Sequence, residues 1–238
     1  MERVSVIKGD PKSNILVVAP HGFDDTYTDV IAEKLQIYLN CHAVINRCFE
    51  RADEVDSVND KANCNSFKHV SDSVVEQEFL KPIKKSVETY YKNQGQVLNT
   101  WGHNAAQPFC IFWIHGMGKN HHAEFVLGYG LGKTNSLTMQ EWRVKMFYDK
   151  LCNIGHVALG APGGKYSARS KDNMTQYFCK HSTSWAFPSV EAVQIEITST
   201  FRSSQNYAEA VAVSLATRIK AVADATAHTP NHPSYKQI

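Results

Sequence analysis

Two uninterrupted apolar stretches, each ending in a histidine and a glycine, constrain this chain more than any other feature of its sequence. Residues 15–19 lead through a proline to His21-Gly22, and residues 108–114 lead to His115-Gly116. Short runs that are apolar at every position predict strands buried on both faces of a sheet. In open α/β sheets, ligands bind just beyond the carboxyl ends of the strands. Both histidines are therefore candidate ligand-binding residues.

Helical and strand patterns alternate along the chain. Apolar residues recur at helical spacing within 27–38, 75–90, 142–147 and 207–223. Further strand patterns lie at 42–46, 124–130, 156–159 and 192–198. Pro82 is expected to kink or split the second helical segment. The alternation predicts one three-layer α/β/α domain over 1–238, with a mostly parallel mixed central sheet, a core at 14–223 and a flexible tail at 227–238.

Composition restricts the possible partners and the compartment. The chain has 238 residues, 43% of them hydrophobic, which is enough for a sizeable core. A net charge of +2 does not indicate the excess of basic residues that is typical of nucleic-acid-binding proteins, so no nucleic-acid partner is expected. No apolar window is long enough to span a membrane and the N-terminus does not resemble a signal peptide, so we expect a soluble, cytoplasmic protein. The six cysteines show no Cys-x-x-Cys pair, and we expect them to be reduced and mostly buried.

The spacing of His21, Asp24 and His115 points to a metal site. A catalytic zinc ion takes three protein ligands and leaves a fourth position for water. His21 and Asp24 would supply two ligands from one loop, and His115 the third from another strand end. Such an ion lowers the pKa of water toward about 7 and polarises a carbonyl group. Glu196, between two isoleucines, is the best candidate for the general base, because a charge there is costly without a purpose.

Each of these residues also has a simpler interpretation. A histidine after a strand is more often a hydrogen-bonded turn residue than a ligand, and Asp24 or Asp25 alone would be a helix cap. Glu196 alone would equally suit an edge strand or a buried ion pair. The coincidence of all these features favours the metal site. The adjacent His121 and His122 are either solvated or ligands of a second ion, and solvation is favoured.

Residues 128–134 test a nucleotide-binding alternative. The phosphate-binding loop requires a glycine five residues before the final glycine of its motif, and Leu127 occupies that position. The next helix is expected to begin near Thr138 rather than at the lysine of the motif. Nucleotide binding is therefore disfavoured.

Taken together and in order, four short motifs resemble those of the N-formylglutamate amidohydrolase family, within the wider carboxypeptidase A-like and aspartoacylase-like zinc hydrolases. The motifs are His21-Gly22-Phe23-Asp24, His115-Gly116, Gly163-Gly164-Lys165-Tyr166-Ser167-Ala168-Arg169 and Gln194-Ile195-Glu196-Ile197. The similarity runs from residue 14 to residue 222. It implies a phosphorylase/hydrolase-like fold, one Zn²⁺ held by His21, Asp24 and His115 (a second ion is not excluded), and Glu196 as general base and then acid.

The resemblance also suggests substrate-binding residues. Relatives hold a substrate carboxylate with arginine, and Arg47 and Arg169 are the best matches. An Asp-x-Asn-Arg stretch of the relatives corresponds most closely to 56–61, with Asn59 in place and Lys61 as a substitute point charge. Many relatives have glutamate where this chain has the shorter Asp24, so Asp25 competes for that role.

The expected function is that of a zinc-dependent amidohydrolase or metallopeptidase. Its substrate would be an N-acyl amino acid or a short peptide with a free carboxylate. Deacylase and carboxypeptidase chemistry are both open at this point, as is the oligomeric state. The alternative is a catalytically inactive ligand-binding or regulatory domain of the same fold. This alternative is motivated by Asp60, which stands where the Asp-x-Asn-Arg stretch of the relatives has arginine.

Overall fold

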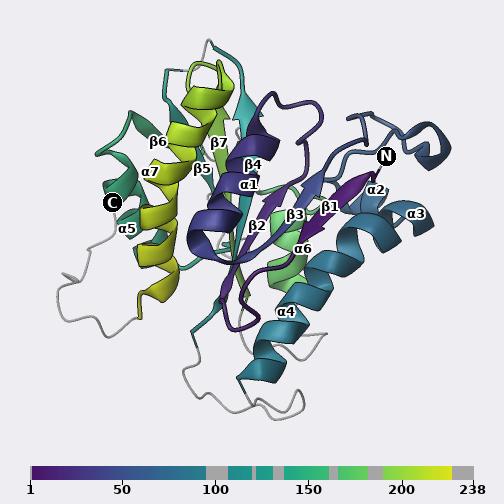
Figure 1. Cartoon of the computed structure of the whole chain (residues 1–238), viewed down its shortest axis with the longest axis horizontal. Coiled ribbons are helices and arrows are strands. Elements are labelled where there is room, and N and C mark those ends of the chain that lie inside the picture. The colour runs from purple at the N-terminus through teal and green to yellow at the C-terminus, as the bar shows by residue number, and fades with distance from the viewer. Residues whose placement is uncertain are drawn as a thin grey trace.

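The computed structural model describes residues 2–94, 107–119, 122–130, 137–160, 166–181 and 190–226. Its strands form one mixed sheet in the order β1-β3-β2-β4-β7-β5-β6 (Figure 1). Their bounds are β1 Val4–Ile7, β2 Ile15–Ala19, β3 His42–Asn46, β4 Phe109–Met117, β5 Phe125–Gly128, β6 Val157–Leu159 and β7 Val190–Thr198. The four central strands β3, β2, β4 and β7 are parallel. The outer strands β1 and β5 pair antiparallel with β3 and β7, which confirms a mostly parallel mixed sheet.

Helices cover both faces of this sheet, as the predicted three-layer fold requires. One layer consists of α1 (Thr28–Leu39), α5 (Glu141–Leu151) and α7 (Gln205–Asp224). The other contains α4 (Lys81–Asn93) and α6 (Met174–His181) (Figure 1). The shorter elements are η1 (Ser57–Asn59), α2 (Phe67–Val70), α3 (Ser73–Val75) and η2 (Glu76–Leu80).

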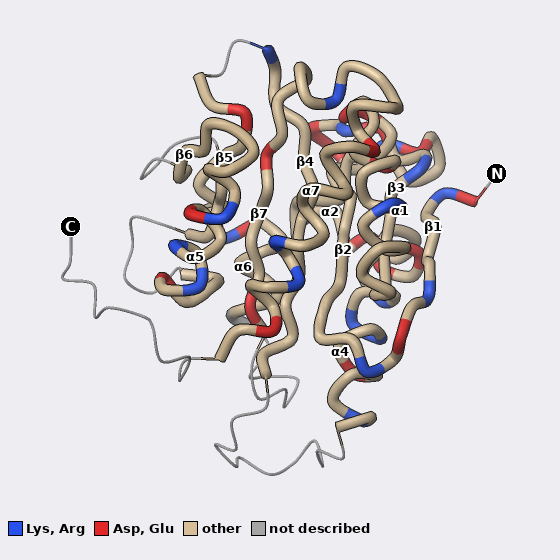
Figure 2. The backbone as a smooth tube through the Cα atoms, turned by 60° about the vertical axis from the view of Figure 1, so that its left-hand side comes forward, with Lys and Arg blue, Asp and Glu red and all other residues tan. Residues whose placement is uncertain are grey.

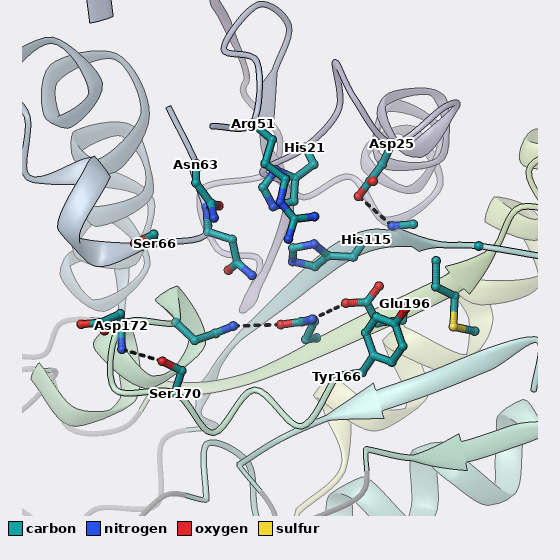
Figure 3. Close-up of a pocket in the computed structure, with 16 residues that line it drawn as sticks. His21, Asp25, Arg51, Asn63, Ser66, His115, Tyr166, Ser170, Asp172 and Glu196 are labelled. Atoms are coloured by element: carbon teal, nitrogen blue, oxygen red, sulfur yellow. Dashed lines mark hydrogen bonds between the residues drawn. The ribbon is translucent and has the colours of Figure 1, made fainter. Parts of the chain in front are cut away.

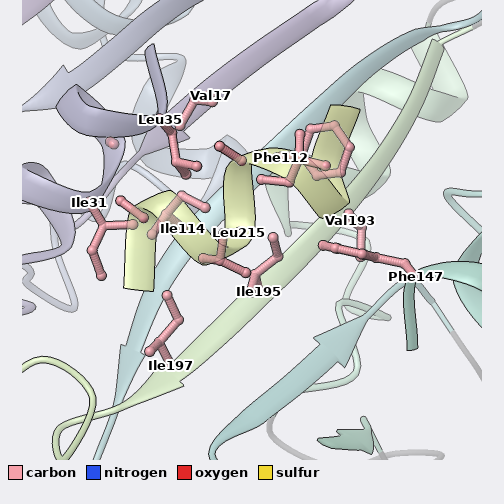
Figure 4. Close-up of a cluster of buried hydrophobic side chains, with 14 of the residues drawn as sticks. Val17, Ile31, Leu35, Phe112, Ile114, Phe147, Val193, Ile195, Ile197 and Leu215 are labelled. Atoms are coloured by element: carbon pink, nitrogen blue, oxygen red, sulfur yellow. The ribbon is translucent and has the colours of Figure 1, made fainter. Parts of the chain in front are cut away.

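Alternate residues of the central strands point to opposite faces of the sheet and pack into two separate hydrophobic cores. Val17, Ile114 and Ile195 pack beneath α1, α5 and α7, around Leu215 of α7 (Figure 4). Leu16 and Trp113 face the layer of α4 and α6. Each fully buried side chain of this kind stabilises the fold by about 1.5–3 kcal/mol. Because both faces are covered, β2 and residues 109–114 of β4 are apolar at every position, and Figure 2 shows β2 and β4 without charged residues.

The same alternation places the candidate site residues. On β4, Ile111 and Trp113 face the layer of α4 and α6, so His115, two residues further, emerges on that side. On β7, Ala192 faces the same layer, and Glu196 therefore has the same orientation. The register pairs His115 directly with Glu196. The sheet thus brings the histidine and the glutamate side by side.

Other expectations from the sequence have mixed outcomes. All six cysteines are free, and they range from buried to exposed, Cys152 being exposed. In the described part of the chain, no helix is both long and apolar enough to cross a bilayer. His121, most of the tested phosphate-loop motif, Gly163-Gly164-Lys165 and the predicted tail at 227–238 lie outside the described residues.

Candidate functional site

A polar cavity of about 350 Å³ opens on the α4 and α6 side, where β2, β4 and β7 end (Figure 3). This is where the strand order places a ligand site, because the chain passes from β2 to β3 on one side of β2 and then crosses back to β4 on its other side. One part of its wall is formed by His21, Asp25, His115, Tyr166 and Glu196. The remainder is rich in amides and hydroxyls, contributed by Asn63, Asn65, Ser66, Ser170, Asn173 and Gln194, and it also includes the carboxyl group of Asp172.

His21 and His115 meet at the base of this cavity. Their ring centroids are 5.2 Å apart, and the two residues are 2% and 3% exposed. The buried atoms His21 Nδ1 and His115 Nε2 have no hydrogen-bond partner among the described residues. An unsatisfied buried polar atom costs about 1–3 kcal/mol, so two such atoms on neighbouring rings require an explanation.

Burial also fixes the protonation of both rings. It lowers the pKa of His21 to about 3, with the positive charge of Arg51 as a second cause. The pKa of His115 is likewise held well below its usual value by burial, by His21 and by Arg51. Both imidazoles are therefore neutral near pH 7, and neutral imidazole is the form that binds metal ions.

Asp25, rather than the expected Asp24, shares the cavity with the two histidines. The backbone N–H of Asp25 donates to the His21 carbonyl at 2.7 Å, which forms one helical turn and returns residue 25 to the side of His21. The Asp25 carboxylate accepts from the Gly116 N–H at 2.9 Å. Asp24 is exposed, and its carboxylate accepts from the Arg51 N–H at 2.8 Å. The local turn thus reverses the order in which the sequence ranks the two aspartates.

The donor chemistry of this cluster fits a metal ion. Two neutral imidazoles with unpartnered nitrogens lie beside a carboxylate, a ligand set typical of zinc. Burial raises the pKa of Asp25, and the Gly116 N–H and Arg202 oppose that rise. Over the residues that the structure describes, no three His, Cys, Asp or Glu side chains already stand in a geometry that could hold an ion. His122 is exposed and lies near His156, away from this cavity.

Glu196, the candidate general base, lies in the cavity wall. It is 4% exposed, and the Gln194 side-chain amide donates to its Oε1 atom. Strand β7 runs between β4 and β5, so the interpretation of Glu196 as an edge-strand surface residue is wrong. A buried carboxylate beside two neutral histidines is suitably placed to exchange protons with a molecule in the cavity.

Arg51 places a cation in the wall of this cavity, and sequence reasoning overlooked it. Its side chain extends beside His21 and toward His115 in Figure 3, and its charge contributes to the lowered pKa of both. It lies in the same polar stretch as Arg47, and no local pattern distinguishes the two.

The four substrate-binding residues expected from the resemblance do not line the cavity. Arg47 forms ion pairs with Asp29 at 2.7 Å and with Glu33, because its side chain extends toward α1. Asn59 is exposed and donates to Asp56 at 2.7 Å, and Lys61 is also exposed. Arg169 is half-buried outside the cavity wall.

A second arginine, Arg202, is buried next to the site and binds the backbone of the segments that form it. It is 6% exposed and donates to the carbonyls of Ile197 at 3.0 Å, Met117 at 3.3 Å and Thr26. These three carbonyls belong to β7, β4 and the loop before α1. Arg202 therefore ties together the segments that carry Glu196, His115 and Asp25.

Comparisons with known proteins show the fold alone. No protein-family model matches the chain, and no curated protein matches it significantly. A gene product of Agrobacterium tumefaciens aligns over 93% of this chain and 95% of its own, with 13% identity and a TM-score of 0.58. A bacteriophage poly-gamma-glutamate hydrolase aligns over 92% and 89%, with 12% identity and a TM-score of 0.50. A metallo-carboxypeptidase from Burkholderia cenocepacia aligns over 94% and 66%, with 10% identity and a TM-score of 0.53. The predicted fold class is thereby confirmed.

Proposed function

We propose that this chain is a zinc-dependent hydrolase that cleaves an amide bond in a small substrate with a free carboxylate, such as an N-acyl amino acid or a short peptide. One observation carries the proposal: two buried, neutral histidines with unpartnered nitrogens face each other in a polar cavity beside Glu196. The proposal is supported by two proteins of the same fold, which are a poly-gamma-glutamate hydrolase and a metallo-carboxypeptidase. A more specific form of this proposal is that the chain is similar in activity to the N-formylglutamate amidohydrolases, whose motifs its sequence resembles.

The residues divide the chemistry between them. His21, His115 and Asp25 would hold the ion, in place of the set with Asp24. A bound zinc ion supplies an activated water molecule and a polarised substrate carbonyl. Glu196 accepts a proton from the attacking water and passes it to the amide nitrogen as the carbon–nitrogen bond breaks. The products are a carboxylic acid and an amine.

The cavity favours a small anionic substrate. Arg51 presents a guanidinium group, which binds a carboxylate through two parallel hydrogen bonds. The wall of amides and hydroxyls suits polar groups on the rest of the substrate. A volume of about 350 Å³ lies near the lower end of the range for small-molecule sites, which suits a molecule of dipeptide size.

The test combines metal analysis with an assay panel. We expect the purified protein to bind zinc and to hydrolyse at least one member of a panel of N-acyl amino acids and dipeptides, with the activity removed by a chelator. Glu196→Gln should keep its zinc and lose activity by about 10²–10⁴-fold, since proton transfer is removed. Glu209→Gln, at a half-buried position on α7 that does not line the cavity, is the matched control and should retain full activity.

Two results would contradict the proposal. The first is less than about 0.3 zinc per chain after reconstitution, because three intact ligands should hold the ion firmly. The second is a fully zinc-loaded protein that binds panel members without turning them over. That outcome would favour the inactive ligand-binding domain.

A further inference from the structure

A chain of side-chain hydrogen bonds leads from the start of α6 to Glu196. The Thr175 N–H donates to Asn173 Oδ1 at 2.9 Å, and the Thr175 hydroxyl donates to the same oxygen. Asn173 Nδ2 donates to Gln194 Oε1 at 3.1 Å, and Gln194 Nε2 donates to Glu196 Oε1 (Figure 3). We call these four residues the amide chain.

The direction of the amide chain is fixed by the backbone. A backbone N–H can only donate, so the atom of Asn173 that faces Thr175 must be its oxygen. The Asn173 nitrogen then faces Gln194 and must meet an oxygen. Gln194 consequently turns its NH₂ group toward Glu196. Although the two amide ends of such side chains have almost the same shape, only this arrangement satisfies every link.

Burial makes the amide chain sensitive to any broken link. Thr175, Gln194 and Glu196 are 0%, 4% and 4% exposed. Away from water, a reversed amide would place its oxygen against the Glu196 carboxylate, which is repulsive. Gln194 and Glu196 also lie two residues apart on the same face of a central strand, so their backbones hold the two side chains together.

We propose that Asn173 and Gln194 are positioning residues that hold the Glu196 carboxylate in its productive orientation. This inference rests on the proposed role of Glu196 as the general base. The start of α6 is itself anchored across the cavity, since Asn173 forms a backbone bridge with Ser66. The amide chain therefore connects the polar wall of the cavity to the group that transfers the proton.

Near-isosteric substitutions test the proposal. Gln194→Glu keeps the shape of the side chain but removes the N–H donor to Glu196. We expect kcat to fall by about 10–100-fold with little change in KM, because a small misplacement of a catalytic group is costly. In a Glu196→Gln background the same change should cost almost nothing further, because the group that it positions is already lost.

Thr175 provides a variant outside the cavity wall. Thr175→Val removes the hydroxyl donor to Asn173, and we expect kcat to fall by about 3–10-fold, the effect of one ordinary hydrogen bond. Thr175→Ser keeps the hydroxyl and should restore kcat. Zinc content and melting temperature are measured for each variant, so that loss of fold or metal is recognised. Unchanged kcat in Gln194→Glu, or effects of the substitutions confined to KM, would overturn the proposal.

A spectroscopic measurement separates this inference from the proposed function. In ¹⁵N-labelled protein, the side-chain NH₂ resonances of Gln194 should shift in both Glu196→Gln and Asn173→Asp. Resonances that do not respond would overturn the amide chain even in an active enzyme. Resonances that respond in a zinc-loaded protein without turnover would contradict the proposed function and leave the amide chain established.

Discussion

At the scale of single residues, the burial of His21 and His115 links the stability of the metal-free protein to pH. The folded-state pKa of His21 is about 3, and that of His115 is also depressed. In the unfolded chain both would titrate near the ordinary histidine value of about 6.5. The unfolded state therefore binds more protons below that pH. Stability is fully present above the unfolded pKa and is lost as the pH falls toward the folded one.

We expect the free energy of unfolding of the metal-free protein to fall more steeply between pH 6 and 4 than in variants without these histidines. His21→Gln should reduce the slope by about 1.4 kcal/mol per pH unit, the value of one proton. The double variant with His115→Gln should reduce it further, because burial lowers the pKa of His115 as well. Urea denaturation in the presence of a chelator measures these slopes. Equal slopes in all three proteins would contradict the burial of neutral rings.

At the scale of elements, local signals locate segment boundaries well but say little about how segments meet. The sequence predicts that Pro82 kinks or splits the segment at 75–90. The backbone stays helical there, but the hydrogen-bond pattern changes: η2 is one π-helical turn, and α4 begins at Lys81 with Pro82 in its first turn. By contrast, nothing local to Gly116 indicates that the guanidinium of Arg202 packs against it.

Gly116→Ala should destabilise the protein at this junction of β4 and β7. The added Cβ would lie 2.4 Å from Nη2 and 2.5 Å from Cζ of Arg202, and three carbonyls hold that side chain in place. We expect a loss of about 1–3 kcal/mol in the free energy of unfolding, as for other overpacked sites. Gly118→Ala is the control, because nothing lies within 4 Å of its Cβ position. Similar urea midpoints for the two variants would contradict the packing described.

At the scale of the whole molecule, metal binding should be visible as global stabilisation. A ligand that binds only the folded state adds about 2.7 kcal/mol when its free concentration is 100 times the Kd. For a chain of this length, that corresponds to a rise in melting temperature of about 5–10 °C.

We expect Zn²⁺ to produce this rise in the wild-type protein and in Asp24→Asn, but not in His115→Ala. Asp25→Asn should lose most of it, because Asp25 shares the cavity with both histidines. Thermal melts with and without zinc provide the measurement. A loss of the effect in Asp24→Asn together with its retention in Asp25→Asn would restore Asp24 as the ligand.

The sequence by itself determined the class of fold and the ends of the two strands that carry the histidines. These features are local: a short run that is apolar at every position indicates a strand covered on both faces, and the residues that follow it enter the ligand-binding edge of the sheet. The alternation of segments then leaves few arrangements other than a three-layer domain.

Only the tertiary structure decided which polar residues meet. The register of β4 against β7 sets His115 beside Glu196, and one helical turn after His21 selects Asp25 over Asp24. Arg47 and Arg51 are chemically alike, yet Arg47 forms an ion pair with Asp29 of α1, whereas Arg51 lines the cavity. Such choices depend on contacts between segments distant in the chain, and no local spacing encodes them. The physical reason is that a side chain's type limits what it can bind, whereas its partner is set by where the backbone carries it.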